Sequence, residues 1–294
     1  MSFRKKQADS DFTESMLPQN RKDIFWDVVK IHWRRLFMMG LLLMVLLMPL
    51  FFLQWIHDSQ LLAVEQKAAH MTQQQLQEAY YQIATAQNIR NAVGVLFWVF
   101  FGIGMAGVCR VIRQYAWMEN VHFFSDFWKG VWDNAKSFAF LGFLVGAVIG
   151  ICAGTYNMLP YAPAYLGWVS LIQIGVLIVV ILPVCALWLS MIPVYTNTAA
   201  KYMLLSFAVY LRSCMRTLPL LLCCLLICVP VLLPMPFFHI IGLLVVSFLL
   251  PFVLLAWTLY SYSLFDVHIN PRFYPQLIGK GILGKYSDSQ ENME

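Results

Sequence analysis

The sequence predicts an all-α membrane protein with six transmembrane helices, and three observations support this prediction. Of the 294 residues, 60% are hydrophobic and only 12% are charged, whereas about a quarter of the residues in a soluble domain are charged. The apolar residues gather into six segments, each near or above the roughly 20 residues that a spanning helix needs. Basic residues fall almost entirely on alternate connections between these segments.

The six apolar segments define a membrane domain at residues 36–264. They are 36–56, 91–112, 137–158, 167–193, 218–236 and 238–264. Pro234, Met235 and Pro236 separate the last two, which predicts a tight turn because proline interrupts a helix. Residues 1–35 are expected to form a polar tail and an interfacial helix, and residues 265–294 a second tail.

The positive-inside rule predicts the orientation of the spans. Alternate connections, beginning with the N-terminal segment, hold 18 Lys and Arg residues, and the remaining connections hold two, Lys67 and Arg90. Because cytoplasmic connections carry the excess of basic residues, both termini are predicted to be cytoplasmic. The polar start of the chain precedes a long apolar run, which predicts a retained first span rather than a cleaved signal peptide.

Three segments that precede odd-numbered spans resemble one another: 23–34, 125–136 and 205–216. Their Phe residues align, and a basic residue follows nine positions later in each. We interpret them as interfacial helices that each enter a two-span hairpin, which makes the domain a parallel threefold repeat. The alternative is that any cytoplasmic entry into a membrane shows an aromatic residue, then a basic residue, then apolar residues.

The loop 57–90 is the only sizeable hydrophilic insert, and its Ala, Gln, Glu and Leu content favours helix. Asp58 or Ser59 is predicted to cap one helix, and Thr72 with Gln75 has capping-box spacing for a second. The simpler interpretation is a helical extension of the first two spans. The alternative is a docking surface for a partner outside the cytoplasm.

Polar chemistry inside the spans is sparse. Gln173 is the only amide well inside a span, and it is expected to bond a neighbouring helix. The seven cysteines fit no zinc motif, and neither a serine elbow nor a phosphate loop occurs. We therefore expect no enzyme activity, no metal or cofactor and no nucleic-acid partner.

The third span carries Gly142, Gly146, Gly150 and Gly154, a glycine at every fourth position. This spacing places all four on one helical face, which permits close approach of another helix. Packing within the bundle is the first interpretation, and a homodimer interface or a pore lining is the alternative. Gly146 and Gly150 are therefore candidate packing positions.

The connection 110–136 is dense in polar and aromatic side chains. Glu119, His122 and Asp126 have the chemistry of a metal or acid–base set, but the ion pairs Glu119–Arg113 and Asp126–Lys129 are the favoured interpretation. If the segment is an interfacial helix, Phe127 and Trp132 lie at the lipid boundary. The candidate partner-binding positions are Glu119, Asp126, Lys129, Asn134 and Lys136.

Residues 100–216 resemble the YesL-like bacterial integral membrane proteins. The similarity lies in a small-residue helix with an Arg-rich end (G104-M-A-G-V-C-R-V-I-R-Q-Y), then Glu119, then D126-F-W-K-G-V-W-D-N-A-K136. P193-V-Y followed by L205-S-F and Arg212 is also similar. The resemblance implies a bacterial protein with about six spans that is associated with carbohydrate uptake, and it implies no catalytic residue.

The expected function is therefore that of a non-enzymatic protein of the bacterial inner membrane, an accessory or regulatory partner of a transport system such as carbohydrate uptake. The expected contacts are the lipid bilayer, a transporter subunit and a second copy of the chain. The alternative function is a small permease or channel for a neutral solute, with Gln173 and the polar cluster 196–198 near its path.

Overall fold

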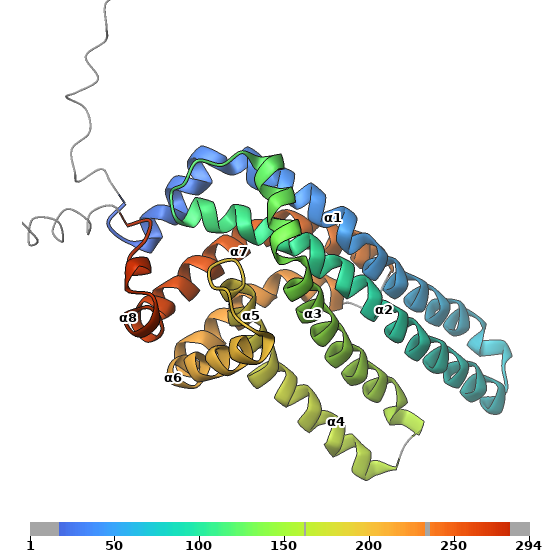
Figure 1. The fold of residues 1–294 in the computed structure, drawn as a ribbon. Helices are drawn as coiled ribbons and strands as arrows, with labels where there is room; N and C mark the ends of the chain where they lie inside the picture. Colours follow the sequence, from blue (N-terminus) through green and yellow to red (C-terminus); the bar gives the residue numbers. More distant parts are fainter. Residues whose placement is uncertain (1–17, 162, 233–235, 283–294) are drawn as a thin grey trace, which may run out of the picture.

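The computed structural model describes residues 18–161, 163–232 and 236–282, and these residues are helical with no β-strand. The helices are α1 (Arg21–Lys67), α2 (Gln73–Ala116), α3 (Phe123–Met158), α4 (Ala164–Val176), α5 (Leu182–Met191), α6 (Ala199–Leu225), α7 (Pro236–His268) and α8 (Asn270–Phe273). Within these residues, six helices are long and apolar enough to span a membrane. The predicted class, a multi-pass all-α bundle, is confirmed (Figure 1).

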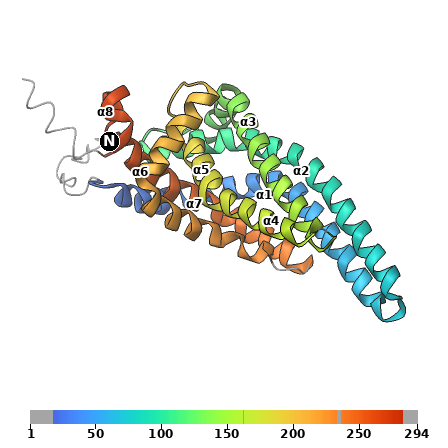
Figure 2. The ribbon, with the colours of Figure 1, turned by 90° about the horizontal axis from the view of Figure 1, so that it is seen from below.

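The helices extend well past the predicted apolar segments, most of all in α1 and α2. These two form a hairpin whose turn, residues 68–72, projects beyond the other helices (Figures 1 and 2). The predicted capping box is present, because Gln75 N–H donates to Thr72 Oγ1 and Thr72 N–H donates to Gln75 Oε1. The helical extension predicted for the insert 57–90 is therefore confirmed.

The predicted cap at Asp58 or Ser59 is wrong. Both residues lie inside α1, where backbone groups already bond within the helix. The Ser59 hydroxyl donates to the carbonyl of Trp55, and Asp58 is buried against α7.

The three predicted interfacial segments are all helical in the structure. In the first, His32 has non-helical backbone angles (φ −116°, ψ 16°), so α1 kinks just before its apolar run. The other two continue directly into the apolar parts of α3 and α6. The turn predicted around Pro234 and Met235 lies outside the described residues, and Pro236 begins α7.

The fourth predicted span is divided by a π-helical turn at Leu177–Ile181, between α4 and α5. Pro183 has no N–H to donate to the carbonyl of Val179, four residues earlier, and its ring crowds that carbonyl. The Tyr210 hydroxyl of α6 donates to the freed oxygen. The neighbouring helix thus satisfies a backbone group that proline leaves unpaired, as membrane helices require.

The glycine ridge of α3 packs against α2, as the sequence predicts. A Cβ on Gly142 would overlap the carbonyl oxygen of Trp98, and one on Gly102 of α2 would lie 2.5 Å from the carbonyl oxygen of Phe138. A Cβ on Gly146 would lie 2.6 Å from Trp98 Cβ. The packing is looser at Gly150, where an added Cβ would lie 3.4 Å from its nearest neighbour, the carbonyl oxygen of Asn91.

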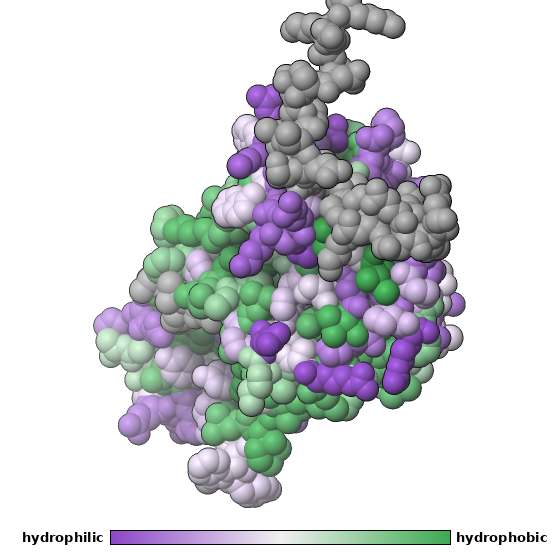
Figure 3. All heavy atoms as spheres, turned by 90° about the vertical axis from the view of Figure 1, so that its left-hand side faces the viewer, coloured by the Kyte–Doolittle hydropathy of each residue, from purple (hydrophilic) through white to green (hydrophobic). Residues whose placement is uncertain are grey.

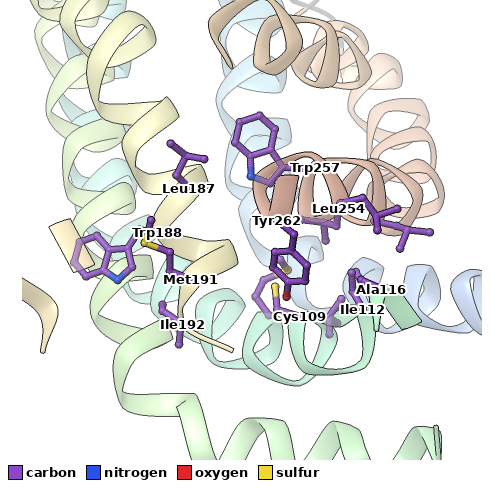
Figure 4. Close-up of a cluster of buried hydrophobic side chains, with 14 of the residues drawn as sticks. Cys109, Ile112, Ala116, Leu187, Trp188, Met191, Ile192, Leu254, Trp257 and Tyr262 are labelled. Atoms are coloured by element: carbon purple, nitrogen blue, oxygen red, sulfur yellow. The ribbon is translucent and has the colours of Figure 1, made fainter. Parts of the chain in front are cut away.

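The hydrophobic core draws on α1, α2, α3, α5, α6 and α7, and Figure 4 shows the part of it where α2, α5 and α7 meet. In this view Tyr262 of α7 points toward Cys109 of α2, and Met191, at the end of α5, and Ile192, which follows it, lie to their left. All four side chains are buried. By contrast, α4 presents large apolar side chains outward, including Trp168 at 72% exposure, as a lipid-facing helix does.

Candidate functional site

The terminal face is the end of the bundle at which Arg21, Asp266 and Lys280 meet. Arg21 Nη2 lies 2.8 Å from Asp266 Oδ2, and Arg21 Nη1 donates to the Lys280 carbonyl oxygen at 2.9 Å. Both side chains of the ion pair are less than one-fifth exposed, at 12% and 17%. A partly buried, hydrogen-bonded ion pair therefore joins the start of α1 to the end of α7. Figure 3 views this end, where hydrophilic residues lie among hydrophobic ones.

Trp117 follows α2 and lies between two cations. The Arg113 guanidinium carbon is 4.7 Å and Lys280 Nζ is 3.9 Å from the ring centroid, within cation–π range. The same cations bind Glu119: Lys280 Nζ is 3.2 Å from Oε1, and Arg113 Nη2 is 3.6 Å from Oε2. Arg113 also donates to the Pro193 carbonyl at 2.9 Å. The predicted Glu119–Arg113 pair is confirmed.

Close backbone packing holds the C-terminal segment in this position. Gly281 has a φ of 92°, which glycine adopts without strain. A Cβ there would overlap the carbonyl oxygen of Ala116, the last residue of α2. Glycine at this position therefore lets the segment lie directly on the end of α2.

A hydrogen-bonded chain ties the α5–α6 connection to α7 and α8. The Tyr195 hydroxyl donates to Asn270 Oδ1 at 2.6 Å, and Asn270 Nδ2 donates to Asp266 Oδ1 at 2.8 Å. Burial, together with the nearby Asp266 carboxylate, raises the pKa of Tyr195 well above its usual value, so the hydroxyl keeps the proton it donates. The Tyr202 hydroxyl in turn donates to the Tyr195 carbonyl.

A cavity of about 140 Å³ opens on the terminal face between the start of α1 and the end of α2. Asp27 and His32 of α1 line one side, and Tyr115, Met118 and Glu119 line the other. The His32 and Tyr115 rings stack with centroids 4.7 Å apart. Asp27 and Glu119 are the carboxylates of this lining.

The predicted Asp126–Lys129 pair does not form among the described ion pairs. The Asp126 carboxylate instead accepts the backbone N–H of His122 at 2.7 Å, directly before α3 begins. This bond satisfies a backbone donor at the helix start, where a negative charge is also favoured by the helix dipole. Lys129 is exposed.

Phe127 is buried, so the prediction that it lies at the lipid boundary is wrong. Its ring covers Gly107 of α2, where a Cβ would come within 2.5 Å of it. Trp132 is 81% exposed, in agreement with the prediction. Phe124, Trp128 and Trp132, at successive i+4 positions, form the exposed aromatic stripe of α3.

The other candidate residues do not converge on one site. Asn134 Nδ2 donates to the Gly130 carbonyl at 3.4 Å within α3, and Lys136 is exposed. Gln173 lies on α4 and makes none of the contacts of the terminal face, and its Oε1 is buried without a partner among the described residues. The described residues hold no group of three His, Cys, Asp or Glu side chains that could bind a metal ion.

A second polar cluster, which the sequence reasoning missed, lies toward the hairpin end. His239 Nε2 of α7 donates to Asp58 Oδ2 of α1 at 2.5 Å, and the two side chains are only 2% and 5% exposed. Gln54 Nε2 donates to Asp58 Oδ1 at 3.1 Å, and Gln87 of α2 donates to Gln54 Oε1 at 3.3 Å. Arg90 then donates to Gln87 Oε1 at 2.8 Å. This hydrogen-bonded network joins α1, α2 and α7.

Comparison with known proteins gives no relative for this chain: no family model, no curated protein and no solved structure matches it. The resemblance to YesL-like proteins therefore stays a prediction from the quoted motifs.

Proposed function

We propose that this protein is a non-enzymatic accessory or regulatory subunit of a transport system in the bacterial cytoplasmic membrane. The 18-to-2 distribution of basic residues supports a cytoplasmic location for the terminal face and both termini. The YesL resemblance, which implies association with carbohydrate uptake, supports a sugar transporter as the partner.

The observation that carries the proposal is that the terminal face is a single preorganised platform. Ion pairs, cation–π contacts and buried hydrogen bonds tie together α1, the ends of α2 and α7, the α5–α6 connection and residues 280–281. A surface that is already rigid loses little conformational entropy when a partner binds. Such a construction suits docking better than it suits a mobile gate.

The start of α3, which begins four residues after Glu119 of this platform, supplies an exposed helix surface. Its aromatic stripe suits the membrane interface, where Trp side chains prefer to lie. Lys129, Asp133 and Lys136 follow at i, i+4 and i+7 and share another face of the helix. Asp133 already pairs with Arg110 at 2.6 Å, so the two lysines are left as the positive groups of that face. This face therefore suits an acidic partner surface.

The arrangement favours this function over the alternative of a small permease. The positions expected near a solute path, Gln173 and residues 196–198, do not line the 140 Å³ cavity. They also belong to different parts of the fold, α4 and the α5–α6 connection.

The double substitution Lys129→Ala with Lys136→Ala should abolish co-purification of transporter subunits and leave membrane abundance normal. Both side chains are exposed, and exposed substitutions usually change the free energy of unfolding by no more than about 0.5 kcal/mol. The measurement is affinity purification from native membranes, with quantification of the protein and of the transporter subunits.

Two controls make this result interpretable. Lys201→Ala, an exposed lysine on α6, should leave co-purification unchanged. Asp126→Ala removes one cap bond, worth about 1 kcal/mol, and should leave abundance intact. Equal loss of abundance and co-purification in the lysine variant would make this face structural and would contradict the proposal.

A further inference from the structure

We propose that Arg212 and Arg216 of α6 bind the headgroup of an anionic phospholipid at the membrane interface. The two arginines lie on a different helix from the α3 face that suits a transporter, so the two proposals succeed or fail independently. In Figures 1 and 2, α6 lies toward the same end of the bundle as α8.

Contacts with neighbouring helices place the two arginines near the ends of two predicted spans. The Ser206 hydroxyl donates to Met191 Sδ at 3.4 Å, and Met191 is two residues before the end of the fourth span. Thr217 Oγ1 shares a hydrogen bond of 2.9 Å with Tyr260 Oη, and Tyr260 is four residues before the end of the sixth span. Both span ends belong to the side that carries the excess of basic residues. The arginines lie between these two contacts, and therefore near the level at which lipid headgroups begin.

The exposed surface of this part of α6 has an apolar face and a basic face. Leu204, Leu211 and Met215 are 66%, 59% and 87% exposed, and their spacing of seven and four residues places them on one side of the helix. Arg212 and Arg216, four residues apart, are exposed on another side. A helix with this division lies with its apolar side chains among acyl chains and its cations at the headgroups. The apolar face therefore selects a lipid rather than a soluble acidic protein as the occupant.

The charge of the surroundings favours an anionic headgroup. Residues 134–265 contain no Asp or Glu, so α5, α6 and most of α7 carry no carboxylate. Neither arginine takes part in an ion pair among the described residues, whereas Arg21, Arg110 and Arg113 each pair with a carboxylate. A guanidinium group matches a phosphate with two parallel hydrogen bonds. Two of them, about one helical turn apart, can bind one lipid headgroup.

The test is a lipid titration of the full chain in a neutral detergent, followed by native mass spectrometry. Phosphatidylglycerol is the anionic probe, and phosphatidylcholine with the same acyl chains is the probe without net charge. The unchanged chain should bind phosphatidylglycerol more tightly. Arg212→Gln with Arg216→Gln should weaken that binding about 25-fold, since each basic residue near an anionic surface contributes about a factor of five. Binding of phosphatidylcholine should not change.

A charge-matched control distinguishes a site from general attraction between a basic protein and an acidic lipid. Lys22→Gln with Arg272→Gln removes the same net charge from exposed positions and should leave phosphatidylglycerol binding unchanged. Both double variants should melt at the temperature of the unchanged chain when no lipid is added, because all four side chains are exposed. Equal weakening by the two double variants, or equal affinity of the unchanged chain for the two lipids, would overturn the proposal.

Two further measurements test the chemistry of the site. Arg212→Lys with Arg216→Lys keeps both charges and should retain most of the phosphatidylglycerol binding, whereas a loss as large as that of the glutamine variant would contradict a headgroup contact. Glycerol 3-phosphate presents a phosphate without acyl chains. It should not compete with phosphatidylglycerol, because the apolar face contributes to lipid binding. Competition would show that the arginines bind a soluble phosphate and would overturn the assignment to lipid.

Discussion

Asp58→Ala should lower the free energy of unfolding by several kcal/mol, because each buried hydrogen-bond donor left without an acceptor costs about 1–3 kcal/mol and this change leaves two. Asp58 and His239 are almost fully buried, and Asp58 also accepts a hydrogen bond from Gln54. Removing the carboxylate leaves His239 Nε2 and Gln54 Nε2 without acceptors in an enclosed region. The same substitution removes the hydrogen bond that joins α1 to α7 near the hairpin end.

Thermal unfolding in detergent, followed by a thiol-reactive dye, measures this loss. Cys223 is exposed and sets the starting signal, whereas Cys109 and Cys185 are buried and become reactive only when the bundle opens. Glu65→Ala, also on α1 but exposed, is the matched control. The double variant Asp58→Ala with His239→Ala should lose less than the sum of the two single losses, because the two groups interact directly. Strict additivity would show that the pair contributes nothing.

Gly142→Ala should also be strongly destabilising, by about 1–3 kcal/mol, because its new Cβ would overlap a backbone oxygen that cannot move without shifting α2. Gly146→Leu should be at least as damaging, since even a Cβ would lie 2.6 Å from Trp98 Cβ.

Gly154→Ala is the matched control on the same ridge. Its Cβ would lie 3.4 Å from Asn88 Oδ1, a side-chain atom, and alanine favours helix over glycine. Its melting temperature should therefore equal or exceed that of the unchanged protein. If Gly142→Ala and Gly154→Ala melt alike, the close packing of α2 on α3 is not what holds the bundle together.

The class of fold and the span positions were predictable because they depend on local properties. The length of each apolar segment predicted a span. The spacing of Thr72 and Gln75 predicted the start of a helix, which the structure confirms. The glycines of α3 were also recognisable, since a four-residue spacing places them on one face whatever the partner helix is.

The Asp58–His239 pair was not predictable by the same reasoning, because 181 residues separate its members. A short acidic residue after an apolar run matches a helix cap, and only the tertiary structure distinguishes a cap from a buried hydrogen-bonded pair. One observation in the sequence could have indicated the pair. Asp58 follows the first apolar segment and His239 begins the sixth, and the alternating topology places both of these ends on the same side of the membrane.

Phe127 shows a second reason why the position of a side chain could not be predicted from the sequence. The alignment with Phe25 and Phe207 placed it at the lipid boundary, but the stronger pattern is the i+4 spacing of Phe124, Trp128 and Trp132, which are the exposed residues. Phe127 then falls on the buried side, above Gly107, where the missing side chain leaves room for its ring.

Labelling of two engineered cysteines in whole cells tests the central claim, that the terminal face is a cytoplasmic platform. Gln74→Cys lies at the start of α2, next to the turn of the α1–α2 hairpin, and Asn120→Cys lies on the terminal face; both positions are exposed. An impermeant thiol reagent should label Gln74→Cys in intact cells and Asn120→Cys only after the membrane is disrupted, with the unsubstituted protein as background. Labelling of Asn120→Cys in intact cells, with Gln74→Cys protected, would contradict the account.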